Sequence, residues 1–242
     1  MDHWPQQLPA AARGSAQNAR QLDRNLSGQS LTTATPCRLF LVTPPLADPA
    51  EVERLTAPLA AALEAGDVAC LLLRLRRRDD DLLRHGSQSL APLVQSKQVA
   101  FLIEDQVELA LQVGAEGVHL SNGGDYGGAR RRLGPDISIG MACRSRDEAM
   151  AAGDQDADYV AFGAFDDPAP TPATIALVEW WSDLMTVPCI AAGGAAPESC
   201  RPLIEAGTDF LVLPDAAWAG PNGGENIRAA MQLIAAAQPS RR

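Results

Sequence analysis

The chain has 242 residues, of which 46% are apolar, so it can bury the core of one large α/β domain or two small ones. Its formal net charge of −10 argues against nucleic acid or an anionic membrane surface as the main partner. No apolar run approaches the roughly 18 residues of a membrane-spanning helix, and the first residues lack the basic start and apolar core of a secretory signal.

The chain divides into an irregular extension and a domain in which expected strands and helices alternate regularly. Residues 1–36 are rich in Gln, Ser, Thr, Ala and Asn, so we expect an irregular N-terminal extension before a domain at 37–238. Strands are expected at 38–43, 68–75, 99–103, 117–120, 137–140, 158–163, 188–192 and 209–213. Helices are expected between them, among others at 49–65, 106–113, 147–153, 197–206 and 225–237.

A repeated joint identifies the fold class. Segments 114–120, 156–163 and 206–213 each end an Ala-rich helix, turn at a small residue, and continue through an acidic residue into a short apolar strand. Such joints are typical of α/β chains with parallel strands. Eight strand–helix units in about 200 residues fit a small (β/α)8 TIM barrel. A doubly wound sheet would normally carry Gly-x-Gly-x-x-Gly after an early strand, which 42–45 lacks, so we predict the barrel.

Cysteine and lysine usage bears on location and chemistry. The five cysteines are scattered and include no Cys-x-x-Cys pair, which favours reduced thiols, a cytoplasmic location and no zinc site. Lys97 is the sole lysine of the sequence, and we expect it at the end of the barrel away from the reactive residues. Schiff-base chemistry is therefore not expected.

The expected strand ends carry a candidate phosphate site, because the reactive residues of a TIM barrel gather at the carboxyl ends of its strands. Gly193 and Gly194 follow the seventh strand, and paired glycines near a helix start offer bare N–H groups to an anion. The alternative is a tight turn into the next helix. Asp215 and Ala216 follow the eighth strand, and the Asp215 carboxylate would repel a phosphate unless it turns away to cap a short helix.

The second expected strand carries candidate cationic residues. Period-two alternation places Leu72, Arg74 and Arg76 on its inward face. Inward guanidinium groups need an anionic partner, which a phosphate or a neighbouring carboxylate would supply. The alternative is a solvated basic run, which we expect for Arg77 and Arg78 but not for Arg74.

Carboxylates follow the third and fourth expected strands. Glu104 and Asp105 end the third strand, and Asp105 could hold Mg2+ through its oxygen atoms. Alternatively, Asp105 and Glu108 form an Asp-x-x-Glu helix-capping pattern, and both interpretations stay open. Asp125 is either a second metal ligand or the start of a helix. His119, in mid-strand, is expected to be a satisfied core residue rather than a base.

In this order, these landmarks resemble the thiamine phosphate synthase family and its thiazole tautomerase relatives. The segment 114–120, Gly-Ala-Glu-Gly-Val-His-Leu, is close to the Gly-Ala-Asp-Gly-Val-His-Leu signature of that family. Further similarity lies at 41–43, 139–140, 145–149, 157–163 and 188–194, so the resemblance covers nearly everything from Cys37 onward.

The resemblance implies an activity and a site. The family joins hydroxymethylpyrimidine pyrophosphate to thiazole phosphate with Mg2+: the pyrimidine loses pyrophosphate and the thiazole nitrogen attacks the cation. Cationic side chains and the metal must then stabilise the departing pyrophosphate. By resemblance, the catalytic residues would be Arg74, Arg76 and Asp105, and the metal ligands Asp105 and Asp125. The substrate-binding residues would be Glu104, Asn122, Gly163, Gly193, Gly194, Asp215 and Ala216.

Several positions depart from the family's pattern. The family has Gln at Leu72, Lys at Arg76 and Ser at Ala142, and its Thr-rich loop with a pyrophosphate-binding Lys is the acidic stretch 165–172 here. Losing one charge-stabilising donor typically costs about 3–4 kcal/mol of transition-state stabilisation.

Three hypotheses follow from these departures: a divergent synthase, another enzyme on the same barrel, and a catalytically degenerate paralogue that binds a phosphorylated ligand or regulates. In each, the expected partner is a small phosphorylated molecule. The sequence leaves the oligomeric state open, with a homo-oligomer as one option.

Overall fold

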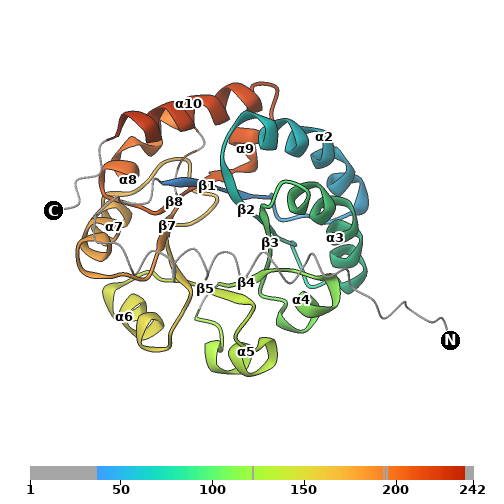
Figure 1. Cartoon of the computed structure of the whole chain (residues 1–242), viewed down its shortest axis with the longest axis horizontal. Coiled ribbons are helices and arrows are strands. Elements are labelled where there is room, and N and C mark those ends of the chain that lie inside the picture. Colours follow the sequence, from blue (N-terminus) through green and yellow to red (C-terminus); the bar gives the residue numbers. More distant parts are fainter. Residues whose placement is uncertain (1–36, 122, 193, 195, 238–242) are drawn as a thin grey trace.

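The computed structural model describes residues 37–121, 123–192, 194 and 196–237. Across these ranges, eight parallel strands close into one barrel in chain order, with helices around the outside (Figure 1). The predicted TIM barrel is therefore confirmed. The expected extension at 1–36 and the candidate residues Asn122 and Gly193 lie outside the described residues.

The strands lie close to their expected positions. They are β1 (Arg38–Val42), β2 (Val68–Leu73), β3 (Ala100–Glu104), β4 (Gly117–Leu120), β5 (Ser138–Ala142), β6 (Tyr159–Phe162), β7 (Cys189–Ala191) and β8 (Phe210–Pro214). Strand β2 ends before the expected residue 75 because the chain leaves the barrel there, and Leu75 makes a lone bridge with Leu46.

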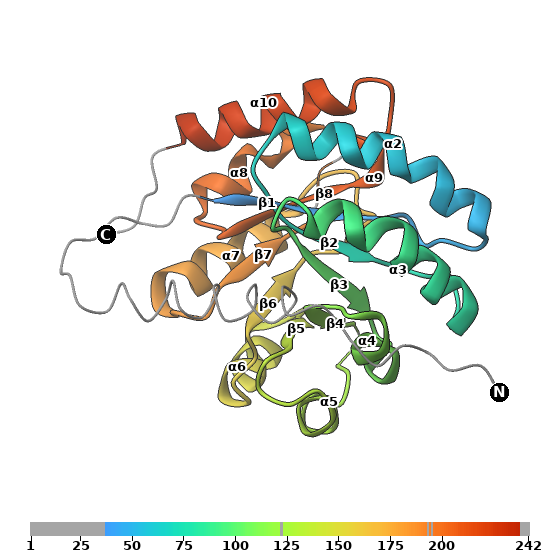
Figure 2. The ribbon, with the colours of Figure 1, turned by 45° about the vertical axis from the view of Figure 1, so that its right-hand side comes forward.

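The helices also follow the predicted order. They are α2 (Pro49–Ala65), α3 (Asp80–Gln95), α4 (Val107–Val113), α5 (Tyr126–Leu133), α6 (Arg146–Asp154), α7 (Pro172–Leu184), α8 (Arg201–Glu205), α9 (Asp215–Trp218) and α10 (Gly223–Ala236). The stretch expected as one helix at 197–206 begins as the 3-10 turn η1 (Pro197–Cys200), because Pro202 has no N–H for the regular helical bond. Figure 2 shows α2 and α10 side by side over β1.

Side-chain alternation builds two apolar layers. Outward residues such as Leu71 and Leu73 pack under the helices in the larger cluster. Inward residues such as Leu72 form a second cluster inside the barrel. Its members are Phe40, Val42, Cys70, Leu72, Leu102, Tyr159, Ala161, Phe165, Ile190, Ala192 and Val212. The alternation predicted for β2 is therefore confirmed for Leu71, Leu72 and Leu73. The inward position expected for Arg76 is wrong, because β2 ends at Leu73 and Arg76 is exposed. No helix in the described part of the chain is both long enough and apolar enough to cross a bilayer.

The acidic residue of each repeated joint binds the neighbouring strand. Glu116 Oε2 accepts the Phe101 N–H of β3 at 2.8 Å, and Asp158 Oδ2 accepts the Ile139 N–H of β5 at 2.8 Å. Asp209 Oδ2 accepts the first N–H of β7 at 2.9 Å. The acidic residue that directly precedes β4, β6 or β8 thus accepts a hydrogen bond from the backbone of the preceding strand.

We predict that Asp209→Ala lowers the free energy of unfolding by about 1–3 kcal/mol, because the Cys189 N–H loses its acceptor at the start of β7. Urea denaturation of the two proteins measures the difference. The control is Asp154→Ala, at an exposed position of α6, which should change stability by less than about 0.5 kcal/mol. Equal effects of the two substitutions would contradict the role given to the joint.

Candidate functional site

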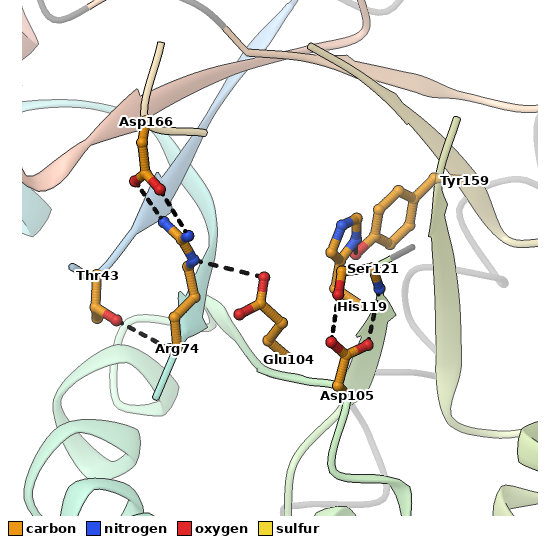
Figure 3. Close-up of polar contacts among 8 residues, drawn as sticks. All are labelled: Thr43, Arg74, Glu104, Asp105, His119, Ser121, Tyr159 and Asp166. Atoms are coloured by element: carbon orange, nitrogen blue, oxygen red, sulfur yellow. Dashed lines mark hydrogen bonds and ion pairs between the residues drawn. The ribbon is translucent and has the colours of Figure 1, made fainter. Parts of the chain in front are cut away.

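The mouth of the barrel is organised around Arg74, which follows β2. Its guanidinium forms a two-pronged ion pair with Asp166 of the β6–α7 loop, with Nη1–Oδ1 at 2.8 Å and Nη2–Oδ2 at 3.0 Å. Nε lies 3.5 Å from Glu104 Oε1. The backbone N–H of Arg74 donates to the buried Thr43 hydroxyl at 3.0 Å, which ties the ends of β1 and β2 together (Figure 3). The predicted anionic partner of Arg74 is therefore supplied by neighbouring carboxylates.

Burial and charge compete at this cluster. The Arg74 side chain is 11% exposed, and burial alone would lower its pKa, but the hydrogen bonds to Asp166 and the negative charges of Glu104 and Asp166 raise it overall. The Glu104 pKa is raised because burial outweighs the attraction of Arg74. Hydrogen bonding from Arg74 lowers the pKa of Asp166, which is 65% exposed. Arg74 thus stays charged while facing two carboxylates.

Asp105 joins two strand ends instead of capping a helix. Its carboxylate accepts the Ser121 N–H at 2.8 Å and also binds the Ser121 hydroxyl, which links the end of β3 to the end of β4. Helix α4 begins after Gln106 without a side-chain capping bond, so the capping interpretation of Asp105 is wrong. The Asp105 backbone has φ of 56°, a left-handed value that is uncommon for a residue with a side chain but is better tolerated by Asp than by most residues.

Asp125 marks the start of α5, one of its two predicted roles. Its Oδ1 accepts the Gly128 N–H at 2.8 Å. Asp125 and Asp105 also border the same hollow of about 240 Å³. Among the described residues, no three His, Cys, Asp or Glu side chains are grouped to hold a metal. Mg2+ is commonly held by one or two carboxylates plus substrate phosphates, and Asp105 and Asp125 are the aspartates that border this hollow.

An aromatic group fills the barrel interior below the ion pairs. His119 is 1% exposed, its Nδ1 lies 3.2 Å from the Tyr159 hydroxyl, and its ring stacks on the Tyr159 ring. Burial lowers the pKa of His119 to about 3, with a further contribution from Arg74, so the imidazole is neutral. A Cβ on Gly140 would lie 1.9 Å from the Tyr159 ring, so glycine there makes room for it. His119 is the satisfied core residue that the sequence predicts.

The remaining predicted residues are spread around the mouth. Arg76 is exposed, and Asp215 begins α9, followed by Ala216. Burial raises the pKa of Asp215, while backbone N–H groups of Ala216 and Asp215 oppose this. The cap position of α9 is held by Pro214, so Asp215 is the first residue of the helix and not its cap. Gly163 is exposed with φ of 82°. Gly194 is buried against the 3-10 turn, where a Cβ would lie 2.5 Å from Cys200 Sγ.

Sequence reasoning missed Asp166, Phe165, Ser121 and Tyr159. For Asp166 a signal existed, because the loop after the sixth strand is acidic and Arg74 required an anion at the same end of the barrel. Ser121 carried no comparable signal, since its role depends on the left-handed backbone of Asp105.

Comparisons with known proteins point to one family. A family model described as thiamine monophosphate synthase matches residues 39–216. The thiamine-phosphate synthase of Rhodospirillum centenum is 44% identical over 198 residues, covering 78% of this chain and 93% of that protein. The thiamine-phosphate synthase of Erythrobacter litoralis is 38% identical over 213 residues, covering 84% of this chain and 96% of that protein.

Solved structures support the fold. The thiamine phosphate pyrophosphorylase from Pyrococcus furiosus superposes with a TM-score of 0.70 at 19% identity, covering 84% of this chain and 97% of that one. The geranylgeranylglyceryl phosphate synthase of Thermoplasma acidophilum superposes with a TM-score of 0.64 at 15% identity, covering 90% and 97%. At these identities the likeness concerns the barrel.

We predict that the Asp166 carboxyl titrates below its ordinary range in the wild type and at higher pH in Arg74→Gln, where its hydrogen-bond donor is lost. The depressed pKa contributes stability that is present above the unfolded value of about 3.9 and is lost as pH falls through the folded value. The contribution is small because Asp166 is largely exposed. An NMR titration of side-chain carboxyl carbons measures the shift. Unchanged titration of Asp166 in Arg74→Gln would contradict the ion pair.

Proposed function

The chain belongs to the thiamine monophosphate synthase family, which places it in thiamine biosynthesis, and we propose that its barrel mouth joins hydroxymethylpyrimidine pyrophosphate to thiazole phosphate. The observation that carries the proposal is the buried Arg74 guanidinium after β2, at the end of the barrel where TIM-barrel enzymes react. Relatives named thiamine-phosphate synthase match along nearly their whole length.

The proposed chemistry breaks one C–O bond and forms one C–N bond. The bond between the pyrimidine methylene carbon and pyrophosphate breaks, and its electron pair leaves on the pyrophosphate oxygen. The thiazole nitrogen then bonds to the methylene carbon. Negative charge accumulates on the departing group, so a positioned guanidinium stabilises the transition state more than the bound substrate.

This chain's residues have separable roles in that reaction. Arg74 binds the departing pyrophosphate, and Glu104 with Thr43 holds Arg74 in place from the side and from the backbone. The aromatic lining, with Phe40 and Tyr159, keeps water from the methylene cation. Asp105 and Asp125 would hold Mg2+, which supplies charge neutralisation when the pyrophosphate is bound.

A specific observation favours the second candidate, a phosphate-binding paralogue without catalysis. Arg74 already faces two carboxylates, Arg76 is exposed, and Lys97 lies between α3 and β3, where it pairs with Glu64 at 2.6 Å. The positive charge available to pyrophosphate is therefore smaller than the family's pattern provides.

The test is product formation by the purified protein with both substrates and Mg2+. We expect thiamine phosphate, and we expect Arg74→Ala to lower kcat/KM by about 100-fold or more, as for the loss of other charge-stabilising donors. The control is Arg84→Ala, because Arg84 is exposed on α3 and pairs with Asp81. No product at high enzyme concentration would eliminate the synthase and leave the paralogue.

A second measurement concerns the metal. We expect chelation of Mg2+ to abolish product formation, and Asp105→Asn to raise the Mg2+ concentration needed for half-maximal rate, because one anionic oxygen is lost at the hollow. The matched control, Asp136→Asn, changes an exposed carboxylate. An identical Mg2+ requirement in the two variants would exclude Asp105 as a ligand.

A further inference from the structure

Two consecutive residues after β6 fill the barrel mouth. The Phe165 side chain is 9% exposed, and its ring stacks on Phe40 with centroids 6.4 Å apart and planes at 25°. On its other side the ring lies 5.1 Å from the His119 ring. The next residue, Asp166, forms the two-pronged pair with Arg74. A flat ring and an anion thus stand side by side, the two features that a phosphorylated aromatic heterocycle presents.

We propose that Phe165 and Asp166 are an internal occupant of the ligand site, and that ligand binding expels them from the mouth. The ring of Phe165 stands in the place of a heterocyclic ring, and the carboxylate of Asp166 stands in the place of a phosphate on Arg74. The class of ligand rests on the proposed function. That Phe165 and Asp166 occupy the site rests on the contacts that these two residues make.

Arg74 is incompletely satisfied by its present partners. Its Nη1 and Nη2 donate to Asp166, but among the described residues its buried Nε has no hydrogen-bond partner, since Glu104 at 3.5 Å makes an ion pair outside hydrogen-bonding geometry. A carboxylate carries two oxygens, whereas a phosphate or pyrophosphate carries more and can engage the whole edge of the guanidinium. An arriving anion therefore has an advantage over Asp166.

The two halves of the occupant are held to different degrees. Phe165 is buried against Phe40 and His119, and the Arg74 guanidinium lies over its ring. Asp166 is 65% exposed, and an ion pair with an exposed partner shifts an equilibrium by at most about fivefold. Gly163, with φ of 82°, and Ala164 precede the pair and are both exposed, so neither contributes a buried side chain to the start of the loop. These features allow the segment to leave while β6 stays in the barrel.

The Phe165 ring covers two aromatic neighbours that a ligand ring could use. It stacks on Phe40 and lies beside His119. A ligand ring placed on Phe40 and His119 therefore requires Phe165 to move.

The first experiment compares anion binding in matched variants. Because an occupied site weakens apparent affinity by the fraction that is open, Asp166→Asn should bind inorganic pyrophosphate with Mg2+ about fivefold more tightly than the wild type. Asp167→Asn removes the same charge from the same loop without touching Arg74, and should bind as the wild type does. Calorimetry on the full-length protein gives the three dissociation constants.

The second experiment separates an occupant from a lid. Hydrogen exchange of residues 163–171 should become faster when pyrophosphate and hydroxymethylpyrimidine are added, because the segment leaves the mouth. A lid that closes over the ligand would exchange more slowly, and that result would overturn the proposal. Equal affinity of Asp166→Asn and Asp167→Asn would also overturn it, as would a lack of pyrophosphate binding in all three proteins.

The occupant and the synthase can fail independently. If Asp166→Asn binds pyrophosphate more tightly but the wild type makes no thiamine phosphate, the internal occupant is supported and the synthase activity is rejected. If the wild type makes thiamine phosphate but the two Asn variants bind pyrophosphate equally, the activity is supported and the internal occupant is rejected.

Discussion

A guanidinium that is almost completely buried imposes the main constraint on this barrel mouth. Arginine does not give up its proton at any pH the protein experiences, so its surroundings must supply negative charge. Asp166 comes from the β6–α7 loop and Glu104 from the end of β3, so three separate parts of the barrel converge on one side chain. The position of that loop, and with it the packing of Phe165 in the interior, depends on this pairing.

Much of the fold could be predicted because it depends on local patterns. The α2 helix begins at Pro49 after the Asp48 cap, and the strand–helix alternation is readable in the spacing of apolar runs. Alternation along β2 was sufficient to place Leu72 inside the barrel and Leu71 under the helices. The acidic residue of the repeated joints was visible in the sequence, but its acceptor role was not, because its donor lies on a neighbouring strand.

The site was less predictable because its decisive contacts are long-range. Arg74 and Asp166 are 92 positions apart, and nothing local indicates which of the two acidic residues in the loop, Asp166 or Asp167, would reach the guanidinium. Asp105 matches a capping pattern with Glu108, yet its left-handed backbone turns the carboxylate toward Ser121. At Asp105, tertiary geometry overrides a local sequence motif. Among the described residues identified by resemblance, Arg74, Glu104 and Asp105 lie at or directly after the ends of β2 and β3.

The acidic residues before β4, β6 and β8 have a consequence for how such a barrel could be assembled. Each binds the odd-numbered strand that precedes its own strand. At the first pair of strands, the ion pair of Arg38 and Asp67 is a charged equivalent. A unit of two strands contains both partners of this interaction, whereas a single strand does not. Two strands are therefore the smallest unit that could be duplicated, exchanged or permuted without leaving a backbone N–H at the strand start without its acceptor.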